Sequence, residues 1–295
     1  MHAPRELLAR LKAALERGEL ELVDSSASAM LPRARAADGD SVQPVHDGDE
    51  TLLDNGLLHA RLSARGALLE CTSPRVRAPI AQANIVSGLG RAPSALAFEL
   101  RRGEPFLRVA LRVDRRLFPQ TLRLENWLAV APPRVRYGIE GRFAAVEDDR
   151  AGLAIFLVPG TSWEERRLRR GGVRVRAVLA RGRAAAELAW AYAPYEPGIS
   201  LGALERAWEA FALPPRVRLF TSEDPAILVN SCRPDGDAVL VSVRECDGEG
   251  RALRLRSGAR AREVRAQDGG EAALDGETIV ARIDAFGTRT FRVTF

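Results

Sequence analysis

The chain has 295 residues and a formal net charge of +5, with 46% hydrophobic and 28% charged residues. This is the profile of a soluble globular protein with a sizeable core, and no apolar run approaches the roughly 20 residues that a membrane helix requires. The N-terminus also lacks the basic start and continuous apolar core of a secretory signal. We therefore expect a cytoplasmic protein with no membrane partner.

The first expected element is a helix over residues 4–18, with a proline in its first turn and Gly18 at its end. One side of this helix carries an apolar stripe, formed by Leu7, Leu8, Leu11 and Leu15. Residues 25–50 are small, polar and proline-containing, as in a linker. We assign residues 1–49 to an N-terminal helix followed by an irregular linker.

Most of the chain after this linker alternates between apolar and polar residues with period two, and short turn signals such as DNG (54–56) and PDGD (234–237) separate the alternating segments. Such strands have one dry face and one wet face. Many strands with almost no helices between them predict an all-β antiparallel sandwich. The alternating segments include residues 107–113, 172–179, 253–258 and 290–295.

A second helix is expected over residues 200–215, where Ser200 would cap the first turn and two prolines end the pattern. Its apolar side would carry Leu201, Leu204, Trp208 and Phe211. We place a domain boundary at the end of this connecting helix. Residues 50–212 would then form a large β-domain and residues 213–295 a small C-terminal β-sandwich.

Residues 227–250 predict a hairpin, because two apolar runs flank a Pro-Asp-Gly turn. Cys232 and Cys246 fall in this segment and could lie near each other across the hairpin. With Cys71 they make three cysteines and no Cys-x-x-Cys pair. This argues against a disulfide framework and against a thiolate zinc site, and we expect reduced structural thiols.

Three segments resemble the C-terminal β-domain region of family 38 glycoside hydrolases, the α-mannosidases. Residues 54–71 (DNGLLHARLSARGALLEC) resemble its opening strand pair, and residues 227–250 resemble a later hairpin with a basic-Pro pair and a strand ending in Arg-Glu. Residues 283–295 (IDAFGTRTFRVTF) resemble its closing strand. The resemblance implies a large antiparallel β-supersandwich, like that of galactose mutarotase, followed by a small β-sandwich.

The resemblance also implies what this chain does not carry. In that family the chemistry takes place in an N-terminal barrel domain, which binds zinc through His and Asp and supplies an Asp nucleophile. No position here matches those residues, so we expect no catalytic residue and no cofactor. The three histidines, His2, His46 and His59, show no metal-ligand spacing, and His59 is expected on the solvent face of a strand.

Other charged groups have both a functional and a structural interpretation. Residues 46–55 (HDGDETLLDN) suit a Ca²⁺ loop or, better, a solvated acidic turn before a strand. A glycosidase requires two carboxylates about 5 to 10 Å apart. The sequence places no two of the candidates across a cleft, and we favour the interpretation that they are loop charges. The candidates are Glu147, Asp148, Asp149, Glu187 and Glu196.

The basic residues do not predict a nucleic-acid partner. Nearly all of them are arginines, Lys12 being the only lysine, and they alternate with acids. A nucleic-acid face requires a contiguous basic patch with stacking aromatics. The best candidate, residues 166–176, fits a solvated strand face and turn.

Aromatic residues are the candidates for carbohydrate contact, because flat rings pack on the apolar faces of pyranoses. Trp163, Trp190, Tyr192 and Tyr195 cluster in the sequence. For Trp190 and Tyr192 we favour the sandwich core. Trp163 and Tyr195 lie beside turn residues, and both interpretations remain open for them.

We therefore expect a non-catalytic β-domain portion of an α-mannosidase-like glycoside hydrolase, which supports a catalytic domain or chain and contacts an oligosaccharide. The apolar stripe of the N-terminal helix would dock this partner, or cover an open end of the sandwich. Two alternatives are a mutarotase-like sugar enzyme that uses His46 or His59 with a carboxylate, and a purely structural interaction module.

Overall fold

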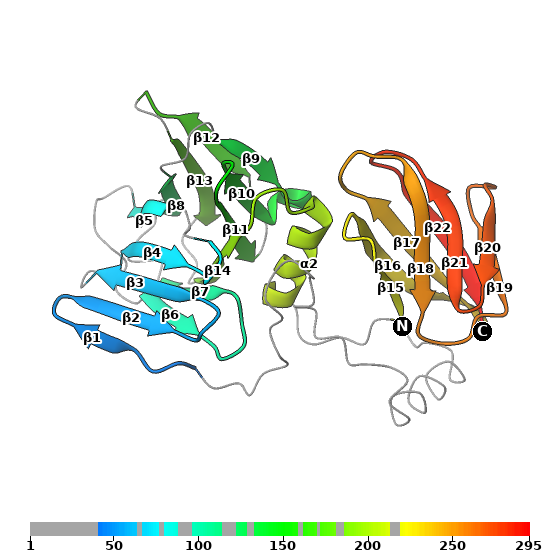
Figure 1. The fold of residues 1–295 in the computed structure, drawn as a ribbon, viewed down its shortest axis with the longest axis horizontal. Helices are drawn as coiled ribbons and strands as arrows, with labels where there is room; N and C mark the ends of the chain where they lie inside the picture. Colours follow the sequence, from blue (N-terminus) through cyan, green and yellow to red (C-terminus); the bar gives the residue numbers. More distant parts are fainter. Residues whose placement is uncertain are drawn as a thin grey trace. The chain divides into compact units, whose positions relative to one another are not determined.

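The structure is a computed structural model. It describes residues 41–63, 67–76, 80–87, 96–113, 122–128, 133–158, 162–169, 172–180, 186–212 and 219–295. The expected N-terminal helix over 4–18 lies outside the described residues, as does most of the expected linker. Within the described residues the chain is mostly β-structure and divides into two compact units (Figure 1).

The larger unit, the large sandwich, contains two antiparallel sheets. One sheet has eight strands in the spatial order β1 (Val45–Asp47), β2 (Glu50–Asp54), β3 (His59–Ser63), β4 (Leu68–Thr72), β5 (Ile80–Ser87), β8 (Leu122–Leu128), β13 (Val173–Ala180) and β12 (Trp163–Arg167). The other has six strands in the order β6 (Leu96–Leu100), β7 (Leu107–Val113), β14 (Ala186–Tyr195), β11 (Gly152–Val158), β10 (Phe143–Glu147) and β9 (Arg134–Tyr137). The first sheet begins with β1, ahead of the boundary expected at residue 50.

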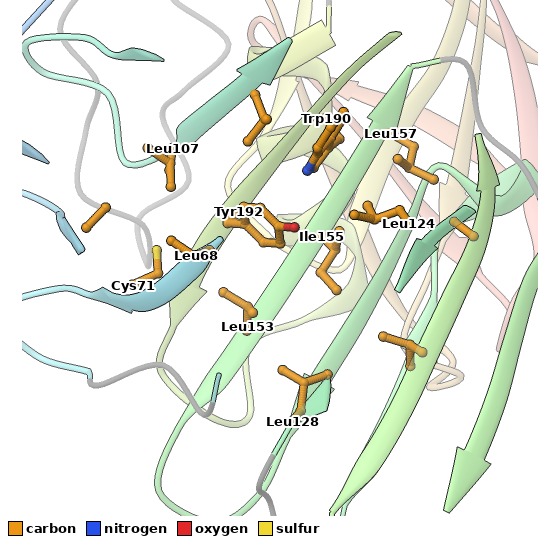
Figure 2. Close-up of a cluster of buried hydrophobic side chains, with 14 of the residues drawn as sticks. Leu68, Cys71, Leu107, Leu124, Leu128, Leu153, Ile155, Leu157, Trp190 and Tyr192 are labelled. Carbon is orange, nitrogen blue, oxygen red and sulfur yellow. The ribbon is translucent and has the colours of Figure 1, made fainter. Parts of the chain in front are cut away.

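Alternate side chains on these strands point into the core between the two sheets, as the period-two pattern predicts. In β13, Val173, Val175 and Ala177 are buried, whereas Arg174 and Arg176 are partly exposed. Figure 2 shows the centre of this core, in which buried residues from both sheets pack together. They include Leu68, Cys71, Leu107, Leu124, Leu128, Leu153, Ile155, Leu157, Trp190 and Tyr192.

The second unit, the small sandwich, has two four-stranded antiparallel sheets. One runs in the order β15 (Phe220–Ser222), β18 (Arg251–Ser257), β21 (Thr278–Ile283) and β20 (Ala272–Asp275). The other runs in the order β16 (Ile227–Asp235), β17 (Ala238–Glu245), β22 (Thr288–Thr294) and β19 (Glu263–Ala266). Its core is separate from that of the large sandwich and includes Val241, Val243, Leu253, Leu255, Ile279 and Phe291. A large sandwich followed by a small one confirms the predicted fold class.

The predicted hairpin at 227–250 is formed by β16 and β17. Asp235 lies opposite Ala238, so a two-residue turn joins the strands, and Gly236 adopts the positive φ (+60°) that such a turn favours. Cys232 lies opposite Val241, and Cys246 lies beyond the end of β17. The two cysteines therefore do not face each other, and both are free thiols.

Glu245, the last residue of β17, is fully buried. Its carboxylate accepts hydrogen bonds from the N–H groups of Asp247, Gly248 and Phe286, each at 2.8 Å. Arg251 pairs with it at 3.2 Å. Glu245, the last residue of the Arg-Glu pair, thus fixes two loops of the small sandwich, which is a structural role.

The second predicted helix is α2 (Leu201–Ala212). The Ser200 hydroxyl accepts the N–H of Ala203 at 3.0 Å, which confirms the predicted cap. Leu204, Trp208 and Phe211 are buried, as the apolar pattern predicts, whereas Leu201 is only partly buried. No described helix is long and apolar enough to span a membrane.

Candidate functional site

A shallow hollow of about 320 Å³ opens on the large sandwich. The term hollow is used below for the surface lined by Tyr137, Glu140, Gly141, Ser162 and Trp163. Tyr137 ends β9 and Trp163 begins β12, the last strands of the two different sheets. Figure 1 shows β9 and β12 at the same end of this unit.

The turn between β9 and β10 forms one wall of the hollow. The Gly138 N–H donates to the Phe143 carbonyl at 3.0 Å and closes this turn. Within it lies a short 3₁₀ turn, η1 (Ile139–Gly141), in which Glu140 and Gly141 have positive φ values of +54° and +68°. A left-handed backbone is ordinary for glycine but unfavourable for glutamate. The chain therefore holds Glu140 in a strained conformation at the edge of the hollow.

Two hydrogen bonds join the edges of the sheets across the hollow. The Trp163 Nε1–H donates to the Gly141 carbonyl at 2.9 Å, and the Tyr137 hydroxyl donates to Glu165 Oε2 at 3.2 Å. Burial and the adjacent Glu165 carboxylate raise the pKa of Tyr137 to about 12. Tyr137 therefore remains a protonated donor at neutral pH, and both aromatic rings are held in a fixed orientation.

The structure separates the four aromatic residues that the sequence offers for carbohydrate contact. Trp190, Tyr192 and Tyr195 are each only 2% exposed. Figure 2 shows Trp190 and Tyr192 inside the core, and the Tyr192 hydroxyl donates to buried Asn126 at 3.0 Å. A ring this deeply buried has no face free for a sugar. Only Trp163, which is partly exposed, lies in the hollow.

Tyr137 and Glu140 were not among the sequence-based candidates. Both lie in the segment RYGIEG (136–141), where an aromatic residue directly precedes a glycine-containing turn. That signal predicts a turn, but it does not predict which part of the chain the turn contacts. Only the three-dimensional structure brings the segment beside Trp163.

The histidines lie elsewhere. His59 Nδ1 is 3.5 Å from Asp54 Oδ2, and both side chains are solvent-exposed. The two residues face each other across β2 and β3, a pairing that the sequence analysis did not identify. His46 contacts Thr51 through Nδ1 at 3.2 Å. Neither histidine lines the hollow.

The candidate carboxylates are engaged in structural contacts. Glu147 is buried and pairs with Arg136 at 3.0 Å, and Asp148 accepts the N–H groups of Arg150 and Ala151 within its own turn. Glu196 lies 3.9 Å from Arg75. For Asp149 the structure gives an exposed turn position, and the side chain of Glu187 lies outside the described residues.

The acidic segment at 46–55 forms the β1–β2 hairpin, in which Asp47 lies opposite Glu50. This matches the acidic-turn interpretation. Over the described ranges no group of three or more His, Cys, Asp or Glu side chains is arranged to hold a metal ion.

Comparison with solved structures finds the same fold in several chains, including the following two. A protein in glycosyl hydrolase family 38 from Enterococcus faecalis matches with a TM-score of 0.57 and 12% identity, over 88% of this chain and 45% of that chain. An α-mannosidase from Enterococcus faecalis V583 matches with a TM-score of 0.53 and 12% identity, over 88% of this chain and 43% of that chain. The chain shares the fold of part of these proteins.

The chain spans less than half the length of either solved protein. The comparison therefore confirms the fold that the sequence resemblance implied. No family model matches the sequence, and no curated protein matches it.

Proposed function

We propose that this chain is a non-catalytic β-domain portion of an α-mannosidase-like glycoside hydrolase and that it supports a catalytic domain or a separate catalytic chain. The observation that carries the proposal is the fold match, which covers 88% of this chain but only 45% of a family 38 protein. At 12% identity the match supports an architecture, so the partner and the activity are proposals.

The charged groups of the large sandwich support a non-catalytic role. A glycosidase requires two carboxylates facing one substrate across a cleft. Glu147 is tied to Arg136, and Asp148 is tied to its own turn. These contacts are structural, and Glu147 is also buried.

Carbohydrate contact is the second part of the proposal, and it belongs to the hollow. Trp163 is the only one of the four proposed aromatic residues that reaches the surface. Contact there would place an oligosaccharide on the large sandwich.

A pull-down tests the partnership. The tagged chain is recovered from its native cell extract, and the eluate is assayed for zinc-dependent α-mannosidase activity beside the purified chain alone. We expect activity only in the eluate, together with a second protein identified by mass spectrometry. Activity in the purified chain, or no activity in either sample, would contradict the proposal.

A matched pair of variants locates the docking surface. If the expected apolar stripe on residues 4–18 binds the partner, Leu11→Glu should remove the activity from the eluate. Ala13→Glu introduces the same charge on the opposite side of the expected helix and should leave the recovery unchanged. Equal recovery with both variants would show that the stripe does not dock the partner.

One observation favours a second function, a mutarotase-like exchange of sugar anomers. His59 and Asp54 form a histidine–carboxylate pair at the surface, and such a pair can move protons at an anomeric centre. NMR of a freshly dissolved pure anomer tests it. A faster approach to equilibrium that is lost in His59→Asn but kept in His46→Asn would support this function, and an uncatalysed rate would exclude it.

A further inference from the structure

The hollow brings together aromatic, acidic and strained residues. Two aromatic side chains from different sheets line it, and so does Glu140, whose backbone is strained. A second carboxylate, Glu165, lies next to it and accepts the hydrogen bond of Tyr137. We infer that the hollow binds the ring of a single neutral hexopyranose, with Trp163 as the platform and with Glu140 and Glu165 as acceptors for the hydroxyl groups. This inference deepens the proposed carbohydrate contact and rests on it.

The aromatic part of the hollow is held ready for stacking. A hexopyranose has an apolar C–H face and a rim of hydroxyls, so it packs on a flat ring while its edge forms hydrogen bonds. The hydrogen bond from Trp163 Nε1 to Gly141 fixes the indole plane. Tyr137, 38% exposed, is fixed in the same way by Glu165. Neither ring needs to be ordered when a ligand binds, which favours affinity.

The polar edge of the hollow selects against negative charge. Glu140 is 80% exposed at its side chain, and its contact with Arg142 is distant, at 3.8 Å. The Arg142 guanidinium lies over the Trp208 ring, 4.6 Å from its centre. A carboxylate has about four acceptor positions, so Glu140 retains acceptors for ligand hydroxyls. Glu165 likewise has only a distant cation, Arg167 at 3.7 Å, whose side chain is mostly exposed. The two carboxylates at the hollow would therefore repel a sugar acid or a phosphate.

The size of the hollow favours one sugar ring. Its volume of about 320 Å³ lies at the lower end of the range of about 300–1,000 Å³ found for small-molecule pockets. Because it is shallow and open, we expect weak binding, with Kd on the order of 1 mM.

The strain at Glu140 supports a ligand site rather than a plain turn. A non-glycine residue in the left-handed region persists only when its surroundings hold it there, and such residues cluster at binding and active sites. Here a glycine would be the favoured residue, yet the chain carries a carboxylate that borders the hollow.

The test measures binding of small probes to the full chain by isothermal titration calorimetry and by ligand-observed NMR. The probes are methyl α-D-mannopyranoside, methyl β-D-glucopyranoside, methyl β-D-glucuronide and choline. We expect at least one neutral glycoside to bind and the glucuronide to bind about tenfold more weakly or not at all.

Three variants assign the binding to the hollow. Trp163→Ala should weaken binding about tenfold, which is the effect expected for loss of a stacking platform. Because Trp163 also packs against the core, a second variant is needed whose fold is not at risk. Glu140→Gly removes the carboxylate and relieves the strained φ, so it should fold well and still weaken binding several-fold. Glu164→Gln is the control, since Glu164 pairs with Arg176 instead.

Several outcomes would overturn the inference. The first is that no neutral glycoside binds, and the second is that the glucuronide binds as tightly as the neutral probes. The third is an unchanged affinity in Glu140→Gly. The fourth is binding of choline alone, which would indicate a cation site. The pull-down of the previous section does not depend on the hollow. Failure here with success there would remove the sugar site and leave the proposed partnership standing.

Discussion

At the scale of single residues, Glu245 has the densest set of polar contacts described above for the small sandwich: three hydrogen bonds from backbone N–H groups and an ion pair with Arg251. A fully buried carboxylate is unfavourable unless its oxygens are satisfied. Burial raises the pKa of Glu245, but hydrogen bonds from the N–H groups of Phe286, Asp247 and Gly248 lower it more, so the pKa lies below the ordinary glutamate value. The ionised form is therefore the one that the fold stabilises.

Replacing Glu245 by glutamine should lower the free energy of unfolding of the small sandwich by about 2–3 kcal/mol at pH 7, because charged hydrogen bonds are lost and an amide faces backbone donors. Glu249→Gln is the matched control. Glu249 also pairs with Arg251, but it is 79% exposed, so we expect a change within about 0.5 kcal/mol. Urea denaturation measures the unfolding free energy of both variants. Equal losses of stability would contradict the stabilising role of Glu245.

The lowered pKa of Glu245 also predicts that the stability of the small sandwich depends on pH. The carboxyl pKa is lower in the folded state than in the unfolded state, where it is about 4.3. The stabilisation is thus complete above that value and is lost as the pH falls through the folded pKa. The difference in stability between the wild type and Glu245→Gln should shrink as the pH is lowered from 7 to 3. A constant difference would show that ionisation of Glu245 is not responsible.

The strained backbone at Glu140 gives a second prediction at this scale. Glycine at φ +54° avoids a steric cost of about 1 kcal/mol, so Glu140→Gly should raise the stability of the large sandwich by about that amount. Glu140→Val, with a branched side chain, should lower it. Thermal unfolding of both variants checks this, and a lower midpoint for the glycine variant would count against strain.

At the scale of elements, local patterns predicted the structure well where one segment decides the outcome. The cap at Ser200, the buried side of α2, the β16–β17 turn and the alternation in β13 are all set by neighbouring residues. The pairing of β5 with β8, and of β8 with β13, is not, because these partners are far apart in the sequence. Sheet order depends on the packing of the whole core, which no local pattern encodes.

The residues of the candidate site likewise differ in how far local sequence could predict them. Trp163 could be proposed because aromatic residues beside turns are visible in the sequence. Tyr137 could not be proposed, since its role depends on β9 and β12 ending side by side. The core position of Trp190 and Tyr192 followed from alternation, and Tyr195 is buried because its ring packs against Gly152, where a side chain would clash.

At Gly202, in the first turn of α2, tight packing and helix propensity predict opposite effects of an alanine substitution. Alanine normally stabilises a helix by about 1 kcal/mol relative to glycine. Here an added Cβ would clash with the Pro225 carbonyl oxygen. We therefore expect Gly202→Ala to be destabilising by about 1–3 kcal/mol, as for overpacked sites. Chemical denaturation gives the sign, and a gain in stability would show that the loop moves aside at little cost.

At the scale of the whole molecule, the two sandwiches are built on separate cores. Each unit contains two packed sheets and its own set of buried apolar residues, which is the usual basis of an independent folding unit. The sequence analysis expected a large and a small β-unit, with a boundary after the connecting helix.

Separate cores predict separate responses to cavities. Leu111→Ala in the large sandwich and Val241→Ala in the small one should each lower local stability, by about 2–5 kcal/mol for the leucine and less for the valine. Hydrogen exchange followed by mass spectrometry should show faster exchange only in the unit that carries the substitution. Loss of protection in both units from either variant would indicate a single cooperative unit.

The charged edge of the eight-stranded sheet has a further consequence. β12 is the last strand of that sheet, and its four residues after Trp163, Glu164, Glu165, Arg166 and Arg167, are exposed. An uncovered edge strand is a template for pairing with another chain, and charged side chains on it suppress such pairing. These charges would keep the edge from fibril-like stacking and so leave Trp163 open to small molecules. Neutralising all four together, unlike the single change Glu164→Gln, should promote self-association through this edge.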